Sequence, residues 1–335
     1  MTDSAPRAYL IGALEENHNA DAGLTADLVR LAAEAGCDAV SVRRWATNEA
    51  FAGEFLREPH AGATRAAVLQ ARELPLEAAA VARKACAEAG IDFVAAPYDA
   101  RSLGELADLD PDAYQAEPAL IGQLDALRQI ASQGKPVYLV AGRCTENEIA
   151  GALHALDGAA VTILHTVAAR GVGLGQTAVG VIPSLASRFG LPVGYYGPEP
   201  GTEGSIAAFA LGASVIEKPF TTDHRLPGPG HAASLDRDEL RRLASALQGL
   251  QSALSATGPR VPFQQELDED ETGRATLVAA RDLAIGEVLS GEMLETRLSG
   301  RGVSPLQSKH VLGKSLAYAV SAGSPITFGI LGDTS

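Results

Sequence analysis

Eight short, mostly apolar runs alternate with alanine-rich segments of helical periodicity, and this alternation constrains the fold more than any other feature. The apolar runs occupy residues 8–14, 38–42, 91–96, 112–116, 136–141, 160–165, 191–195 and 213–217. Such runs are typical of parallel strands that are covered on both faces. Several of the segments between them end in glycine, as helices commonly do. Eight strand–helix units in succession predict an α/β fold, the (β/α)8 TIM barrel.

A doubly wound dinucleotide-binding sheet is the main alternative, and the positions of the glycines argue against it. Gly12 lies within the first run, and no G-x-G-x-x-G sequence follows that run. The glycines of residues 171–175 come only after the sixth run, away from the first strand–helix turn where pyrophosphate binds. We therefore expect no dinucleotide site.

A change of composition after the eighth helical segment predicts a domain boundary. We expect the barrel over residues 1–256 and a linker over residues 257–273, which contain two prolines and a run of acidic residues. Residues 274–335 read as short strands and turns, so they predict a small β-rich domain with little core of its own.

The charge and composition exclude several classes of protein. The chain of 335 residues carries a formal net charge of −14, which argues against nucleic acid or an anionic membrane as a partner. We find no uninterrupted apolar run of about 18 residues and no signal peptide, so we expect no membrane span. Cys37, Cys86 and Cys144 are far apart and odd in number, which favours reduced thiols and a cytoplasmic location.

Polar residues at the ends of the predicted strands are candidates for a site, because barrel sites lie at the C-terminal ends of the strands. The candidate acid–base groups are His18, His165 and Glu199. The candidate substrate-binding residues of the barrel are Glu16, Asn17, Arg43, Arg44, Asp99, Arg143 and Lys218.

Two interpretations of the arginines remain open. Arg43, Arg44 and Arg143 can form an anion site, because a guanidinium pairs bidentately with carboxylate or phosphate. Alternatively, Arg43 and Arg44 pair with Glu15 and Glu16 in a solvated rim. For the histidines, a purely structural role is at least as reasonable as catalysis.

Several phrases resemble, in order, those of the sialic acid (nonulosonic acid) synthase family with its C-terminal antifreeze-like SAF domain. The phrases are IGALEENHNA (11–20), GIDFVAAPYD (90–99), QGKPVYLVAG (133–142), ASVIEKPFTTD (213–223), ATLVAARDLAIGEVLS (275–290) and GRGVSP (300–305). The resemblance implies condensation of phosphoenolpyruvate with an N-acylated hexosamine at a divalent metal. It also implies a domain-swapped homodimer, in which an arginine of the SAF domain reaches the partner's pocket. That arginine falls on Leu298 in one register and on Arg297 after a slip of one residue, so Arg297 and Arg301 are the candidates for this contact.

The chain departs from the family at the residues that the resemblance makes most important. The two metal-binding histidines of the family fall on Pro198 and Pro219, and two of its lysines fall on Ser41 and Gln115. Proline has no side-chain lone pair, so we expect no metal cofactor. A weaker metal candidate combines His224 and His231 with an acidic neighbour.

Two functions therefore remain open for a divergent family member. One is remodelled catalysis, a synthase or transferase that forms a C–C bond on a sugar-like or anionic substrate. The other is a non-catalytic paralogue that binds a ligand or an active synthase. The first predicts a closed pocket with convergent Arg, His and Glu groups, and the second a pocket filled by Tyr195, Tyr196 and the prolines.

Overall fold

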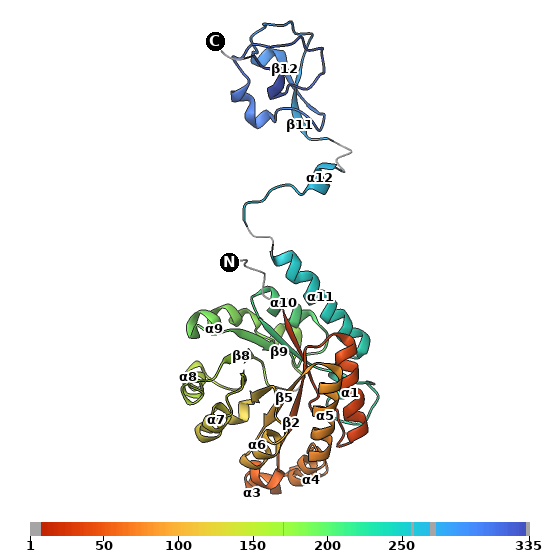
Figure 1. Ribbon diagram of the computed structural model, residues 1–335, viewed down its shortest axis with the longest axis vertical. Coiled ribbons are helices and arrows are strands. Elements are labelled where there is room, and N and C mark those ends of the chain that lie inside the picture. The colour runs from red at the N-terminus through yellow and green to blue at the C-terminus, as the bar shows by residue number, and fades with distance from the viewer. Residues whose placement is uncertain (1–7, 170, 256–257, 269–272, 333–335) are drawn as a thin grey trace. The chain divides into compact units, whose positions relative to one another are not determined.

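The computed structural model describes residues 8–169, 171–255, 258–268 and 273–332 (Figure 1). The chain divides into two compact units, residues 1–257 and residues 258–335, and each is described by itself. No helix in these described ranges is long and apolar enough to cross a membrane.

The first unit is a closed barrel of eight parallel strands, which confirms the predicted fold. Around the barrel the strand order is β1-β10-β9-β8-β7-β6-β5-β2. The strands are β1 (Tyr9–Ala13), β2 (Ala39–Arg44), β5 (Asp92–Pro97), β6 (Ala113–Ala116), β7 (Val137–Ala141), β8 (Val161–His165), β9 (Val193–Tyr196) and β10 (Val215–Pro219). Each overlaps one of the eight runs predicted from the sequence.

Helices surround the barrel, and local sequence signals explain where they begin and end. They are α1 (Ala22–Ala35), α5 (Leu76–Ala89), α6 (Ala100–Ala107), α7 (Leu124–Ala131), α8 (Glu146–Ala155), α9 (Ile182–Phe189), α10 (Glu203–Ala210) and α11 (Arg237–Ser255). The side chain of Asp21 caps α1 by accepting a 2.7 Å hydrogen bond from Leu24 N, and Gly36 ends that helix at φ 97°. Thr145 and Glu148 form a reciprocal capping box at the start of α8.

The barrel interior is packed, so a ligand can only enter at its mouth. Ile11, Val94, Val140 and Leu164 are buried and belong to one apolar cluster inside the strands. A larger apolar cluster lies between the strands and the surrounding helices. This arrangement places any site at the loops that follow the strands.

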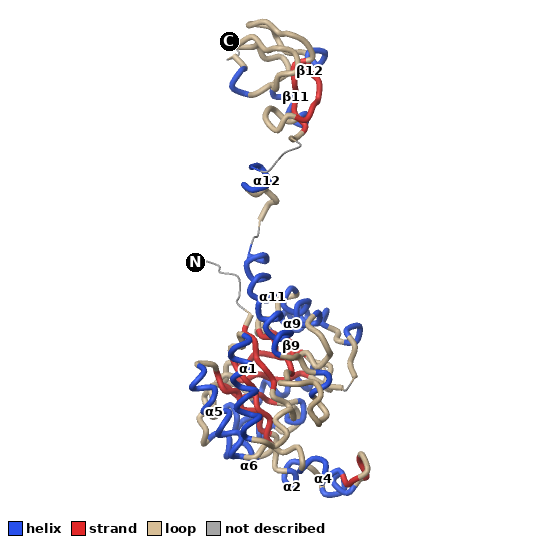
Figure 2. The backbone as a smooth tube through the Cα atoms, turned by 90° about the vertical axis from the view of Figure 1, so that its right-hand side faces the viewer, coloured by secondary structure: helices blue, strands red, loops and turns tan. Residues whose placement is uncertain are grey.

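Between β2 and α5 the chain forms an excursion for which the sequence predicted no elements. It comprises α2 (Thr47–Ala50), α3 (Gly53–Arg57), a hairpin of β3 (Pro59–His60) and β4 (Ala63–Thr64), and α4 (Arg65–Gln70). Figure 2 shows α2, α4 and the hairpin extending away from the barrel. Its elements have six residues or fewer, too few to show a hydrophobic period.

The second unit is small and β-rich. Strand β11 (Ala275–Ala279) pairs antiparallel with β12 (Leu294–Leu298), after a short helix α12 (Gln264–Asp268) in the expected linker. Linker residues 257 and 269–272 lie outside the described residues. A core of its own includes Leu277, Leu283, Val311 and Ile326.

Candidate active site

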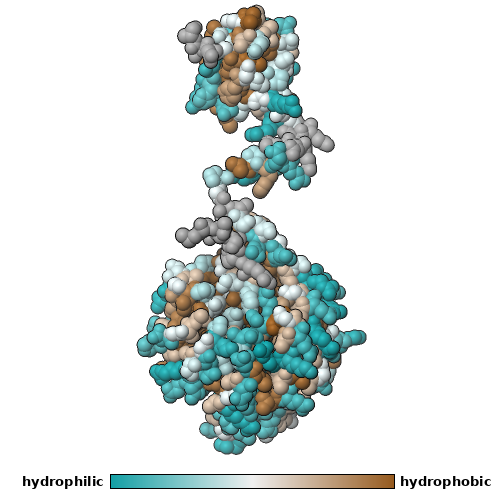
Figure 3. Space-filling view, in the orientation of Figure 1, coloured by the Kyte–Doolittle hydropathy of each residue, from teal (hydrophilic) through white to brown (hydrophobic). Residues whose placement is uncertain are grey.

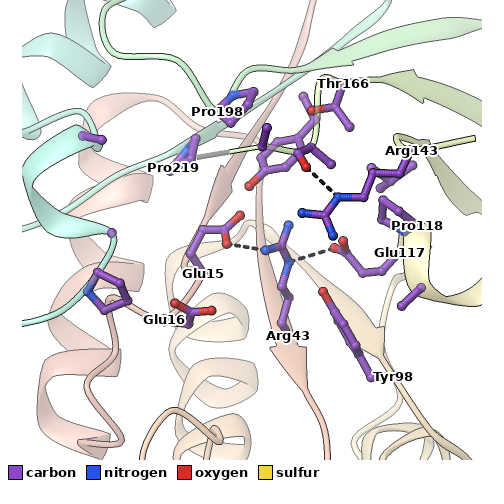
Figure 4. A pocket seen from close by; sticks show the side chains of 18 of the residues that line it. Glu15, Glu16, Arg43, Tyr98, Glu117, Pro118, Arg143, Thr166, Pro198 and Pro219 are labelled. Atoms are coloured by element: carbon purple, nitrogen blue, oxygen red, sulfur yellow. Dashed lines mark hydrogen bonds and ion pairs between the residues drawn. The ribbon is translucent and has the colours of Figure 1, made fainter. Parts of the chain in front are cut away.

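A cavity of about 550 Å³ opens at the C-terminal mouth of the barrel (Figure 4). Loops that follow seven of the strands contribute to its wall, together with the excursion after β2. The residues that matter for its chemistry are Glu15, Glu16, Arg43, Phe51, Tyr98, Glu117, Arg143, Tyr196, Pro198 and Pro219. A polar cavity of this size is suited to a small molecule.

Arg43, at the end of β2, is the charged centre of the cavity. Its Nε donates a 2.8 Å hydrogen bond to Glu117 Oε1, and its Nη1 pairs with Glu15 (Figure 4). The guanidinium carbon lies 5.4 Å from the centre of the Tyr196 ring. Burial alone would lower the pKa of Arg43, but the carboxylates of Glu117 and Glu15 outweigh it and raise that pKa well above its ordinary value. Two carboxylates thus compensate the single positive charge.

Glu217 is a buried acid just below this ion-pair cluster, in β10. Ser41 Oγ donates a 2.6 Å hydrogen bond to Glu217 Oε1, whereas Oε2 has no hydrogen-bond partner among the described atoms. Burial, followed by the negative charge of Glu117, raises the pKa of Glu217 to about 8. Its carboxyl group is therefore mainly protonated at neutral pH. Burial similarly raises the pKa of Tyr98, which stays a neutral hydroxyl on the cavity wall.

Arg143, in the loop after β7, presents the second guanidinium of the cavity. Its Nε donates a 2.7 Å hydrogen bond to Ala168 O, and its backbone has a φ of 56°. No carboxylate of the described residues lies within ion-pair distance of it. Its four terminal N–H groups are consequently available to a ligand.

Of the predicted substrate-binding residues, Glu16, Arg43 and Arg143 line the cavity, and Arg44 and Asp99 do not. Glu16 lies 3.8 Å from Arg72. Arg44 points outward to Glu105, with a 2.7 Å hydrogen bond from Nε. Asp99 caps α6 and accepts a 2.8 Å hydrogen bond from Ala46 N. Arg43 therefore pairs with Glu15 in a largely buried position and not in a solvated rim, whereas Arg143 lines the cavity.

The predicted acid–base residues His165 and Glu199 are held elsewhere in the barrel wall. His165 Nε2 lies 2.9 Å from Thr177 O, and burial lowers its pKa. Glu199 is buried 3.2 Å from Lys218 Nζ and accepts a 2.8 Å hydrogen bond from Tyr195. Lys218, also a predicted binding residue, is thereby neutralised inside the protein rather than at the cavity.

Asn17 and His18 join the first and last loops of the barrel. Asn17 Nδ2 donates to Phe220 O and to Ser234 Oγ, both at 2.8 Å. His18 Nδ1 accepts a 2.9 Å hydrogen bond from Ala20 N, so a neutral ring carries its proton on Nε2. Burial and the nearby His231 lower the pKa of His18 to about 4. In the second unit, Arg297 is exposed and pairs with Glu295 at 2.6 Å.

The two residues onto which the resemblance places the family's metal ligands do not fit a metal ion. Pro198 and Pro219 lie side by side on the cavity wall and offer no ligand atom (Figure 4). Two acids of the cavity wall, Glu15 and Glu117, already bind Arg43, and the third, Glu16, lies 3.8 Å from Arg72. A divalent ion would have to compete with a guanidinium for each of these carboxylates.

A different group of potential ligand atoms lies outside the cavity. Those of His224, Asp236 and Glu239 are within 4.8 Å of one another. Asp236 and Glu239 form a reciprocal hydrogen-bonded cap at the start of α11, with two 2.9 Å bonds, and this explains their proximity without an ion. His231 instead contacts Thr221 Oγ1 at 2.7 Å, so the predicted pairing of His224 with His231 as ligands is not formed.

Glu117 and Glu217 are central to the geometry, and sequence reasoning overlooked both as site residues. A signal for Glu117 existed, because it is the first residue after β6 and so lies at the mouth. Glu217 sits within an apolar strand, and its role depends on the register that places Ser41 and Arg43 nearby.

Comparison with known proteins places this geometry in context. The model of the NeuB family matches residues 28–258, and that of the SAF domain matches residues 274–329. An N,N'-diacetyllegionaminic acid synthase of Campylobacter jejuni is 30% identical over 92% of this chain and 95% of its own length. The human N-acetylneuraminate-9-phosphate synthase is 24% identical over 93% of this chain and 89% of its own length.

Two solved structures have the same fold. The N-acetylneuraminic acid synthetase of Leptospira borgpetersenii, crystallised with citrate, aligns with a TM-score of 0.70 at 23% identity. The alignment covers 79% of this chain and 90% of that one. The putative spore coat polysaccharide biosynthesis protein E of Chromobacterium violaceum aligns with a TM-score of 0.75 at 18% identity, over 97% and 99% of the two chains.

Proposed function

Because this chain belongs to the NeuB family of sugar-acid synthases, we propose that it is a divergent member that binds a sugar-like substrate at the barrel mouth without the family's metal. The observation that supports the proposal is an unfilled cavity of about 550 Å³, in which Arg43, Arg143 and three glutamates converge beside Pro198 and Pro219, although it opens at the barrel mouth and is not the closed pocket expected from the sequence. Tyr195 does not fill it, because its hydroxyl is bound to Glu199.

In this proposal, side chains of the cavity replace the divalent metal that the family resemblance implies. Arg143 and Tyr98 supply hydrogen-bond donors for a carbonyl or carboxylate oxygen. Glu16 accepts hydrogen bonds from sugar hydroxyl groups. The reaction proposed for such a site joins C3 of an enolpyruvyl donor such as phosphoenolpyruvate to the carbonyl carbon of the sugar-like substrate, while water adds at C2 of the donor and inorganic phosphate leaves.

One observation favours the second candidate, a non-catalytic paralogue. Neither His18 nor His165 lines the cavity, and no other histidine is among its described lining residues, although histidine is the residue type most often used as a general base. Binding without turnover is therefore the alternative proposal. A coupled assay of phosphate release from phosphoenolpyruvate, with N-acetylmannosamine as acceptor, separates the two.

Thermal unfolding with added ligands tests the common part of the proposal. We expect a sugar or sugar acid, N-acetylmannosamine or N-acetylneuraminate, to raise the melting temperature equally well with EDTA present. We expect Mn²⁺ to add nothing to any shift that phosphoenolpyruvate produces in EDTA. A stabilisation by phosphoenolpyruvate that requires Mn²⁺ would show that the family's metal site persists and would overturn the proposal.

We propose further that the chain works as a cytoplasmic homodimer with exchanged SAF domains, as the family resemblance implies. All three cysteines are free thiols, and Cys37 and Cys86 are buried, which supports a reducing compartment. Large apolar side chains are exposed on the second unit, among them Leu306 at 92%. Such side chains support an interface with another surface.

A further inference from the structure

We infer that His224, Asp236 and Glu239 form a site for one divalent transition-metal ion, away from the cavity at the barrel mouth. His224 lies in the loop that follows β10, and the two acids lie at the start of α11. The potential ligand atoms of this trio are all within 4.8 Å of one another. An ion held there would be structural, because it would join a loop to a helix, and it is distinct from the metal that the family resemblance implies for the reaction.

The imidazole of His224 is oriented as metal-binding histidines usually are. Its Nδ1 lies 3.2 Å from His231 O. A carbonyl oxygen can only accept a hydrogen bond, so Nδ1 carries the proton, and Nε2 of the neutral ring keeps its lone pair. A histidine that binds a metal through one ring nitrogen commonly donates its other N–H to a backbone carbonyl in this way. His231 is itself buried and lies 2.7 Å from Thr221 Oγ1, so the residue that supplies the carbonyl is anchored.

The lone-pair nitrogen of His224 lies beside two carboxylate oxygens. Nε2 is 3.6 Å from Asp236 Oδ2 and 3.6 Å from Glu239 Oε2. The reciprocal cap at the start of α11 explains why the two acids are close to each other, but it does not explain the imidazole, which comes from another loop. A neutral imidazole there has its lone pair beside two anionic oxygens, and a cation bound by all three atoms would turn this repulsion into attraction.

The two acids of the trio have no other cation to pair with. Neither Asp236 nor Glu239 has a lysine or arginine within ion-pair distance among the residues that the structure describes. Lys218, whose charge also acts on Glu239, is held 3.2 Å from Glu199. The other charged residues of this region form pairs of their own: Asp223 with Arg225, Glu34 with Arg237, and Asp238 with Arg241. With a neutral imidazole the trio carries two negative charges, which one divalent ion would balance.

The mixed set of one nitrogen and two oxygen ligands selects among divalent ions. Ca²⁺ and Mg²⁺ take shells of oxygen ligands. Zn²⁺ and related transition metals accept imidazole nitrogen together with carboxylate oxygen, with bonds of roughly 2.0–2.2 Å. The three side chains are exposed or partly exposed, so they have room to close around such an ion, and water can complete its coordination. We therefore expect Zn²⁺ to be preferred over Ca²⁺ and Mg²⁺.

Isothermal titration of the full chain with the chlorides of Zn²⁺, Mg²⁺ and Ca²⁺ tests the inference. The titration is done at about pH 7.5, above the ordinary pKa of histidine. We expect one Zn²⁺ per chain to bind at least tenfold more tightly than Mg²⁺ or Ca²⁺ and to raise the melting temperature. Failure of Zn²⁺ to bind saturably would mean that the imidazole serves only as a cationic partner of the two acids. That result, or equally tight binding of Mg²⁺, would overturn the inference.

Two substitutions make the test specific to the trio. His224→Asn removes Nε2 but keeps an amide donor for His231 O. Asp236→Asn removes the charge but keeps an oxygen that can accept the cap bond from Glu239 N. Each should weaken the binding of Zn²⁺ at least tenfold and abolish the rise in melting temperature. His154→Asn, at an exposed histidine of α8, is the matched control and should bind Zn²⁺ as the wild type does.

Unchanged Zn²⁺ affinity in both trio variants would place the ion elsewhere and overturn the inference. The outcome is also separable from the test of the proposed function, because binding to the trio needs no phosphoenolpyruvate. Stabilisation by metal alone that His224→Asn abolishes would support this site and leave the proposed function standing. Stabilisation by phosphoenolpyruvate that requires Mn²⁺ and persists in His224→Asn would overturn the proposed function alone.

Discussion

Arg43 brings a positive charge into the mouth of the barrel, and Glu15 and Glu117 make its burial tolerable. A buried charge costs several kcal/mol unless it is paired, and here two carboxylates share that task. The same cluster affects the buried Glu217. Burial and the negative charge of Glu117 raise the pKa of Glu217, so its carboxyl group stays protonated to an unusually high pH.

Glu217→Gln should flatten the dependence of stability on pH. The pKa of Glu217 is raised from 4.5 to about 8, so the folded state binds this proton more tightly than the unfolded chain does. The free energy of unfolding therefore falls as pH rises from about 4.5 to about 8, by up to about 1.4 kcal/mol per pH unit. Melting temperatures measured from pH 5 to pH 9 should show the variant gaining several degrees on the wild type at the alkaline end.

The matched control for this prediction is Glu88→Gln, a change at an exposed glutamate of α5. Its melting temperatures should run parallel to those of the wild type. If Glu217→Gln also ran parallel, the carboxyl group would be ionised in the folded protein at neutral pH.

At the residue scale, the sequence predicted where the cavity lies better than it predicted the contacts of individual side chains. It predicted that Glu16, Arg43 and Arg143 lie at strand ends, because a (β/α)8 pattern places such residues at one mouth. The partners of Glu199 and His165 depend on which way each side chain turns from its strand, and the spacing of residues does not contain that information. For this reason the buried ion pair of Lys218 with Glu199 could not be predicted from the sequence.

At the element scale, the barrel closes where its first and last strands pair. The register joins Ala13 to Pro219, and the loops after β1 and β10 continue side by side. Asn17 bridges these loops through its two hydrogen bonds from Nδ2. The fit is close, because a Cβ on Gly230 would lie 2.5 Å from Asn17 Oδ1.

Asn17→Ala should loosen this closure and destabilise the barrel. The change leaves Phe220 O and Ser234 Oγ without their buried donor, which costs about 2 kcal/mol or roughly 4–8 °C in melting temperature. Chemical denaturation followed by circular dichroism measures the loss. Asn147→Ala, at an exposed position of α8, is the control and should change stability by less than about 0.5 kcal/mol. Equal effects of the two substitutions would mean that Asn17 does not hold the loops together.

The eight strands were predictable because each is long enough to bury a continuous apolar run. The excursion between β2 and α5 was not predictable, since its helices and two-residue strands are too short to show a hydrophobic periodicity. They are stabilised instead by contacts between side chains. Phe51 and Phe55 stack with ring centres 5.9 Å apart, and Arg65 lies over the Phe55 ring at 4.0 Å. Phe51 also lines the cavity, so this segment, for which the strand pattern gave no signal, contributes to the wall at the barrel mouth.

At the scale of the whole molecule, the two units differ in how completely each buries its apolar surface. The barrel has an extensive core, whereas the second unit exposes Ile285 at 68%, Tyr318 at 64% and Leu306 at 92%. Figure 3 shows apolar atoms gathered in the middle of the visible face of this unit. A unit of this size gains little from its own core, so an interface with another surface would add to its stability.

Leu306→Glu should therefore weaken the proposed dimer. The substitution puts a charge on the most exposed large apolar side chain of the second unit, where desolvation in an interface would be costly. Light scattering coupled to size exclusion should show dimeric wild type and a shift toward monomer in the variant at micromolar concentration. Gln307→Glu adds the same charge at the neighbouring exposed position of the same 3-10 turn, Pro305–His310, and should stay dimeric if the apolar contact matters. A monomeric wild type, or two variants that dissociate equally, would contradict an interface through Leu306 and leave the exposed apolar side chains without a partner.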